Sequence, residues 1–391
     1  MQRNCLSLFL ILCTLTCHAD YYSGLDALKE KKYAAAADEF RSLSELGLGK
    51  ASFQYARMLE KGQIAEPDQE QAYAWYSLAS KQGYAKADKA IKKLKKQLTK
   101  AQQAQGADLA KELIEQYGAY ALENFLNPTM TGLPAYIRSG DTEGLKWPRE
   151  VNFSKRATIV QLEYDVDEQG SAIDFQVLRH APEPYVREAM RFLRTQQHGS
   201  PGGFLLDGSI AFFKKGLAEN YGPARLLKKL RKRADKGSPY RKYYYANALE
   251  FANVLGHEYE NELAGDWYLR AAQEGYTKAQ YIVGRRLMLG RGYGQDLVNG
   301  QKWLEIAAQN NHPSANYFLA RIHKREGDQE RYLDFLTTSA NNGHTTAMLH
   351  LAVRAHGEGN QPQALQWLEA AADHLDQVRY QRTKKMILAQ H

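Results

Sequence analysis

Small and aromatic residues recur along this chain at spacings that fit paired helices. The basic pattern is an aromatic residue, two small residues four and five positions later, and a turn residue eight positions later. The full copies are Trp75, Ala79, Ser80, Gly83; Trp267, Ala271, Ala272, Gly275; Trp303, Ala307, Ala308, Asn311; and Phe335, Ser339, Ala340, Gly343. Another copy begins at Trp367 with Ala371 and Ala372. Because an offset of four stays on one face of a helix, each copy predicts a helix that ends at a turn.

A second pattern of small residues follows these turns. An alanine stands four residues beyond each turn. In the copies that begin at Ala51, Ala279, Ala315 and Ala347, an aromatic residue or Leu stands two residues after this alanine and a small residue stands five after it. The alanines are Ala87, Ala279, Ala315 and Ala347, and Ala51 opens the first full copy. The turns at Gly275 and Asn311 are 36 residues apart and those at Asn311 and Gly343 are 32 apart, which fits a helix–turn–helix repeat. One such hairpin cannot cover both of its faces, so the copies predict an α-solenoid with a concave surface.

These residues resemble the Sel1-like repeat, a relative of the tetratricopeptide repeat. The family pattern has a Gly-rich loop, an Asp, Ala-x-x-Trp-Tyr, Ala-Ala and Gly-x-x-x-Ala. The matching residues are Asp68, Ala72, Trp75, Tyr76 and Gly83 in one copy and Gly290, Gly292, Asp296, Trp303 and Ala307 in another. The resemblance covers about residues 25–120 and 220–375. The copy around Phe335 has lost its Gly-rich loop, and the copy before Tyr240 is only half recognisable.

The helical pattern is interrupted between the two groups of repeats. Apolar residues alternate with polar ones from Val160 to Val166 and again from Ile173 to Val177, and 167–170 has the composition of a turn. This predicts a β-hairpin. A helix is expected from Pro184 to Arg194, followed by a last strand through Ile210 and Phe212.

This order of elements resembles the C-terminal domain of TonB-family proteins. The matching residues are Pro148, Val166, Asp167, Gly170, Val177, Glu188, Ala189 and the segment from Gly208 to Phe212. The resemblance implies a small α+β (β-β-α-β) domain that binds partners through an exposed strand edge. A generic α/β insert without a partner is the alternative, because a fold does not fix a function.

The first residues have the layout of a secretory signal peptide. Arg3 precedes an apolar run from Leu6 to Thr16, and the segment ends in the small residue Ala19. We therefore expect cleavage after Ala19 and a periplasmic location; an uncleaved N-terminal membrane anchor is the alternative. The predicted organisation is a signal peptide at 1–19, repeats with closing helices at 20–125, the insert at 128–216 and further repeats at 218–391.

Candidate chemistry is sparse in the sequence. The three cysteines, Cys5, Cys13 and Cys17, all fall in the predicted signal peptide, so the mature chain is expected to have none. Asn261 stands where a zinc-protease motif beginning at His257 requires a second His. His323 or His350 as a metal ligand is the alternative to a structural histidine. We expect no enzyme activity, no metal and no cofactor.

Other sequence features suggest structure or surface charge. The segment from Gly290 to Gly294 lacks the Lys and Ser/Thr of a P-loop and is interpreted as the turn of a repeat. Thr99 and Gln102 have the spacing of a capping box and predict the start of a helix. The net charge is +8, and two basic clusters flank the insert. They contain Lys86, Lys89, Lys92, Lys93, Lys95 and Lys96, and Arg225, Lys228, Lys229, Arg231, Lys232 and Arg233.

These clusters are interpreted either as a docking patch for an anionic surface or as solvated helix faces. Folding could bring them to one junction. The patch hypothesis rests on Lys92, Lys93, Lys96, Lys228, Lys229, Arg231 and Lys232. Nucleic acid is not an expected partner of an exported chain.

The leading hypothesis is a periplasmic adaptor that holds one protein on the concave repeat face and another on the strand edge of the insert. The predicted contact residues are Tyr243, Tyr244, Tyr245, Tyr281, Arg285, Tyr317 and Arg321. Envelope proteins are the expected partners. The alternatives are a protein that binds peptidoglycan, an acidic glycan or an anionic membrane, and a cell-wall-related enzyme.

Overall fold

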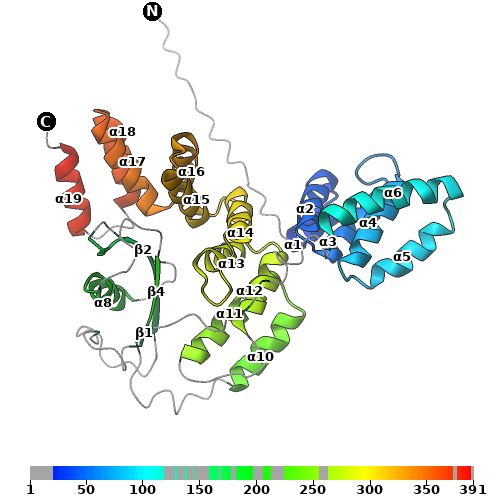
Figure 1. The fold of residues 1–391 in the computed structure, drawn as a ribbon, viewed down its shortest axis with the longest axis horizontal. Helices are drawn as coiled ribbons and strands as arrows, with labels where there is room; N and C mark the ends of the chain where they lie inside the picture. The colour runs from blue at the N-terminus through cyan, green and yellow to red at the C-terminus, as the bar shows by residue number, and fades with distance from the viewer. Residues whose placement is uncertain are drawn as a thin grey trace, which may run out of the picture.

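A computed structural model of the chain shows two blocks of paired helices and a small sheet (Figure 1). It describes residues 21–118, 128, 130, 137–138, 145, 158–166, 169–177, 182–196, 206–212, 224–254, 263–372 and 377–388. The predicted signal peptide, His257 and Asn261 lie outside the described residues, and so does the side chain of Arg225. No described helix combines the length and the apolar character needed to span a membrane.

The first block consists of helices α1 to α6, which pack mostly as neighbours in sequence. Their bounds are α1 Tyr21–Lys29, α2 Tyr33–Glu45, α3 Gly49–Glu60, α4 Gln69–Lys81, α5 Lys86–Lys95 and α6 Lys100–Tyr117. The capping box predicted at Thr99 is confirmed: its hydroxyl accepts from the Gln102 backbone N–H, and the Gln102 side chain accepts from the Thr99 backbone N–H. α6 therefore begins where the sequence places it.

The second block consists of helices α10 to α19, which Figure 1 shows as an arc of hairpins. Their bounds are α10 Ala224–Asp235, α11 Pro239–Val254, α12 Ala264–Gln273, α13 Thr277–Leu289, α14 Leu297–Gln309, α15 Pro313–Glu326, α16 Gln329–Asn341, α17 Thr345–Gly357, α18 Gln361–Ala371 and α19 Gln377–Leu388. Each helix packs against the next in the chain. The helical hairpins predicted from the aromatic and small residues are present in both blocks.

The turn residue of the pattern has a specific backbone requirement. Gly83, Gly275 and Gly343 have φ values of 84°, 94° and 92°, and Asn311 has a φ of 57°. Glycine adopts this left-handed region without strain, and asparagine tolerates it better than most residues. This explains why position eight of the pattern is Gly in three copies and Asn in the fourth.

The small residues are required where helices approach closely. The alanines four residues beyond each turn, including Ala279 and Ala347, are fully buried. Gly284 of α13 is the extreme case, because a Cβ there would lie 2.9 Å from the Gly300 carbonyl oxygen of α14. Most of the apolar core lies between successive hairpins, as expected for a solenoid.

The insert contains a four-stranded sheet with strand order β1-β4-β2-β3. Its elements are β1 Ile137–Arg138, β2 Thr158–Val166, β3 Ala172–Val177, α8 Glu183–Arg194 and β4 Leu206–Phe212. β2 pairs antiparallel with both β3 and β4, and β1 adds a parallel pair to β4. Alternate residues of β2, from Val160 to Val166, join the α8 side chains in a core. The predicted hairpin, helix and last strand are present, and β1 was not predicted.

Candidate functional site

The first region of interest is the boundary between the sheet and the inner side of the second block. Figure 1 shows the sheet and α8 inside the arc of α10 to α19. β3 packs against α17, and Met130 forms an isolated β-bridge with Tyr293. Burial raises the pKa of Tyr164 on β2, and the positive charges of Arg291 and Arg285 oppose that rise. The insert therefore occupies part of the space that the repeats enclose.

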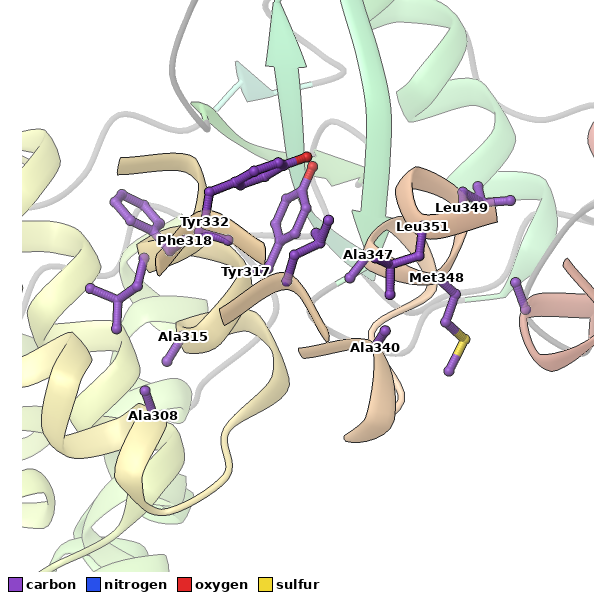
Figure 2. Packing of buried hydrophobic residues seen from close by; sticks show 14 of the residues in the cluster. Ala308, Ala315, Tyr317, Phe318, Tyr332, Ala340, Ala347, Met348, Leu349 and Leu351 are labelled. Carbon is purple, nitrogen blue, oxygen red and sulfur yellow. The ribbon is translucent and has the colours of Figure 1, made fainter. Parts of the chain in front are cut away.

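Four of the predicted contact residues lie in this part of the solenoid. Tyr281, Arg285 and Tyr317 are only 3%, 4% and 2% exposed, and Arg321 is half-buried. Tyr281 and Tyr317 belong to the core between successive hairpins, as do the residues labelled in Figure 2. A partner would reach these tyrosines only if the packing opened, because the aromatic position of the pattern fills space between repeats.

This aromatic position forms a regular ladder of ring pairs through the molecule. In each pair a ring of one hairpin contacts the residue that directly follows the turn. The pairs and their centroid distances are Phe53–Tyr84 at 5.1 Å, Tyr243–Tyr276 at 4.9 Å, Tyr281–His312 at 4.5 Å and Tyr317–His344 at 4.4 Å. The last two are stacked face to face. The ladder explains the aromatic residues of the repeat as structural elements.

The histidines also have structural roles. His312 and His344 accept hydrogen bonds from the backbone N–H groups at the starts of α15 and α17. Burial lowers the pKa of His344 to about 3, so its ring stays neutral at ordinary pH. His323 lies 3.0 Å from a Glu326 oxygen and stacks on Phe335, and His350 contacts the Tyr317 ring. Within the described residues no group of three or more His, Cys, Asp or Glu side chains could hold a metal.

The second region of interest is the free edge of the sheet. β3 is the last strand in the order and pairs with β2 alone among the described strands. Ile173 and Val177 on this strand are 38% and 36% exposed. An edge strand offers unpaired backbone N–H and C=O groups to another chain. The strand edge expected from the sequence is therefore present, beside α17 of the repeats.

Comparison with known proteins identifies the helical hairpins. The model of the Sel1 repeat matches residues 49–84, 254–276, 277–312 and 345–374. The chain contains Sel1 repeats. The match omits 313–344, which holds the copy without a Gly-rich loop, although α15 and α16 form a hairpin there as the other repeats do.

Two solved structures with low sequence identity are also similar. A Sel1 repeat protein from Oxalobacter formigenes is 16% identical over 91% of this chain and 100% of its own, with a TM-score of 0.34. The protective antigen c5321 of uropathogenic Escherichia coli, which displays an SLR fold, is 15% identical over 90% of this chain and 68% of its own, with a TM-score of 0.32. No curated protein matches the chain.

The two blocks of Sel1 repeats meet at Glu274, the residue that directly follows α12. Its carboxylate accepts from Lys50 of α3 at 2.7 Å and from Lys242 of α11 at 2.8 Å. The Tyr21 backbone N–H also lies 3.4 Å from the Glu274 carbonyl oxygen. This junction joins parts of the chain more than 200 residues apart, and sequence reasoning missed it because no local pattern marks it.

The two basic clusters lie on helices of different blocks. Lys92, Lys93 and Lys96 are exposed at α5, and Lys228, Lys229, Arg231 and Lys232 are exposed on α10. α5 packs against α4 in the first block, and α10 packs against α11 in the second block. The combined patch therefore stays a prediction, with its two halves on helices of different blocks.

The tyrosine cluster of α11 has three different environments. Tyr245 is buried against Trp267, and Tyr243 contacts both Tyr268 and Tyr276. Tyr244 is 51% exposed and faces a groove between α10 and α11. Sequence reasoning named Tyr244 but missed the groove. The sequence feature that could have indicated the groove is the four-residue spacing of Tyr240 and Tyr244 directly after a basic helix.

Proposed function

We propose that this chain is a periplasmic adaptor that binds protein partners, and that the β3 edge is one of its binding surfaces. Sel1 repeats generally mediate protein–protein interactions, and stacked repeats present extended surfaces to other proteins. The observation that carries the proposal is the edge position of β3 with exposed Ile173 and Val177.

A partner strand added to β3 would gain main-chain hydrogen bonds, and Ile173 and Val177 would supply apolar contacts. The edge lies beside α17, so the added strand would be close to the Sel1 repeats as well. This arrangement supports an adaptor whose insert and repeats contribute to one surface. It also extends the resemblance to TonB C-terminal domains, in which partners bind at a strand edge.

The test is an affinity pull-down from envelope extract with the mature chain from Asp20 onward. Each captured protein is purified and its affinity for the chain is measured. Ile173→Lys with Val177→Lys is expected to weaken a true partner at least about tenfold, because charged side chains block edge pairing. Leu297→Lys with Val298→Lys is the matched control, since those residues are 54% and 67% exposed on α14. If the captured partner bound the β3 variant and the α14 control variant with equal affinity, the edge hypothesis would be overturned.

The periplasmic location is tested separately. N-terminal sequencing of the chain from a periplasmic fraction is expected to begin at Asp20, because the predicted cleavage follows Ala19. Recovery of the uncleaved chain in the membrane fraction would contradict this location and support the anchor alternative.

A further inference from the structure

The groove between α10 and α11 has the size of a binding site. Its volume is about 430 Å³, within the range of ligand pockets in proteins. Its lining residues are Leu230, Arg233, Tyr240, Arg241 and Tyr244. Tyr240 and Tyr244 are 55% and 51% exposed, and their ring centroids lie 6.2 Å apart. Two aromatic rings and one leucine thus form an apolar surface that two guanidinium groups flank.

The groove is held in place by contacts to other elements. The Gly237 carbonyl in the turn between α10 and α11 accepts from Lys242 at 2.8 Å and from Tyr22 of α1 at 3.2 Å. Lys242 is in turn bound to Glu274. The Tyr240 ring also packs edge-on against Tyr276. A surface fixed in this way loses little conformational freedom when a ligand binds.

The charge of the groove selects the class of ligand. Residues 226–241 include seven Lys and Arg but only one acidic residue, Asp235. Arg233 and Arg241 are exposed, and neither has an ion-pair partner among the described residues. Guanidinium groups bind carboxylates in a planar, two-point geometry. An anionic ligand with carboxylates is therefore favoured.

The lining favours a peptide over a glycan or a membrane. Leu230 and the tyrosine rings offer apolar contact, while the amide and carboxylate side chains that commonly bind sugar hydroxyls are absent from the described lining. The surface is also a groove, whereas a lipid headgroup layer is broad and flat. A short segment with apolar side chains between carboxylates matches both the rings and the arginines.

We propose that the α10–α11 groove binds an acidic peptide segment of a partner protein. Arg233 and Arg241 bind carboxylates of the segment, and an apolar side chain lies against Tyr240 and Tyr244. The inference rests on the proposed function, because it supplies a second protein-binding surface to the same adaptor.

The experiment measures binding of a fluorescein-labelled hexapeptide of alternating aspartate and phenylalanine to the mature chain. Arg233→Glu with Arg241→Glu is expected to weaken binding at least tenfold, and Tyr244→Ala about fivefold. Lys92→Glu with Lys96→Glu at α5 makes the same change of net charge and is expected to alter binding less than twofold. Circular dichroism of every variant checks that the fold is kept.

Several outcomes would overturn the proposal. Equal loss of binding in the α5 control would show attraction by net charge alone. Equally tight binding of a peptide with asparagine in place of aspartate would remove the role of the arginines. Absence of peptide binding would also contradict the proposal. If Arg233→Glu with Arg241→Glu abolished binding to phosphatidylglycerol vesicles or soluble peptidoglycan but left peptide binding unchanged, the groove would be a site for that lipid or glycan. The β3-edge measurements are independent of these results, so either hypothesis can fail alone.

Discussion

The first and second blocks contain the same Sel1 pattern, but the tyrosine of its Trp-Tyr pair has different surroundings in the two blocks. In the first block the Tyr76 hydroxyl donates to Glu60 at 2.7 Å, and the exposed Lys93 lies 3.9 Å from the same carboxylate. In the second block the Tyr268 hydroxyl donates to Glu250 at 2.9 Å, and Glu250 also pairs with Arg286. Glu250 is 3% exposed and Arg286 is 8% exposed.

The difference shows that one local pattern can support very different energetics. A tyrosine reaches back to a glutamate of the preceding helix in both blocks. Only in the second block is the glutamate buried with a cation, so it depends on its partner for solvation. We therefore expect the second block to be more sensitive to substitutions at this position.

The largest expected effect comes from removing Arg286. Arg286→Ala would leave the buried Glu250 carboxylate without its cation and is expected to lower the free energy of unfolding by about 3–5 kcal/mol. The same change should shift the urea transition of the second block far more than that of the first. Trp75 alone reports on the first block by fluorescence once the other four tryptophans, Trp147, Trp267, Trp303 and Trp367, are replaced by Phe. If Arg286→Ala lowered the free energy of unfolding by less than Lys93→Ala, the comparison between the two blocks would be contradicted.

The next prediction concerns pH. The ring after the turn is Tyr84 in the first block, whereas the second block has Tyr276 and two histidines, His312 and His344. Burial lowers the pKa of His344 to about 3, with smaller effects from His350 and His312. An unfolded His has a pKa near 6.5. Between these values the unfolded chain binds a proton that the folded chain does not, so stability falls as the pH drops below about 6.5.

The expected contribution of His344 between pH 7 and pH 5 is a loss of about 2 kcal/mol. His344→Asn keeps a side-chain acceptor for the start of α17 and removes the titrating ring. The free energy of unfolding of this variant should therefore depend less on pH than that of the parent chain, as measured by urea titrations at both pH values. An unchanged pH dependence would show that His344 does not stay neutral when folded.

The ring ladder also shows how far sequence reasoning could go. Gly83, Gly275, Asn311 and the small residues predicted the hairpins because turn conformation and close helix contact restrict the local sequence. Tyr281 and Tyr317 were predicted as contact residues, but they pack in the core because the same aromatic position fills space between repeats. The sequence pattern alone does not tell which face of a helix its neighbours cover.

Long-range contacts were beyond prediction for a different reason. Glu274 joins Lys50 and Lys242, and Gly237 accepts from Tyr22, yet none of these residues lies in a repeated position that marks a partner. The α10–α11 groove depends on this junction, since the turn that shapes it is held from α1. The basic residues of α10 were visible in the sequence, but the groove beside them required the fold.

A smaller effect tests the close helix contact of the second block. The first block has Ala56 and Ala72 where the second has Gly284 and Gly300, so Gly284→Ala restores the ordinary residue of the repeat. The added Cβ would meet the Gly300 carbonyl oxygen and the Leu304 backbone nitrogen at 2.9 Å each. Overpacking should outweigh the gain in helix propensity and lower stability by about 1 kcal/mol. A thermal transition raised by the substitution would show that the two helices can separate without cost.

The smallest effect is expected at Lys93, the cation beside the first-block glutamate Glu60. Its side chain is 71% exposed and 3.9 Å from Glu60, so water already solvates both charges. Lys93→Ala should change the free energy of unfolding by less than about 0.5 kcal/mol, because exposed ion pairs contribute little. Urea titration of the two alanine variants at low and high salt measures the contrast. A loss at Lys93 comparable to that at Arg286 would mean that burial does not determine the strength of the interaction.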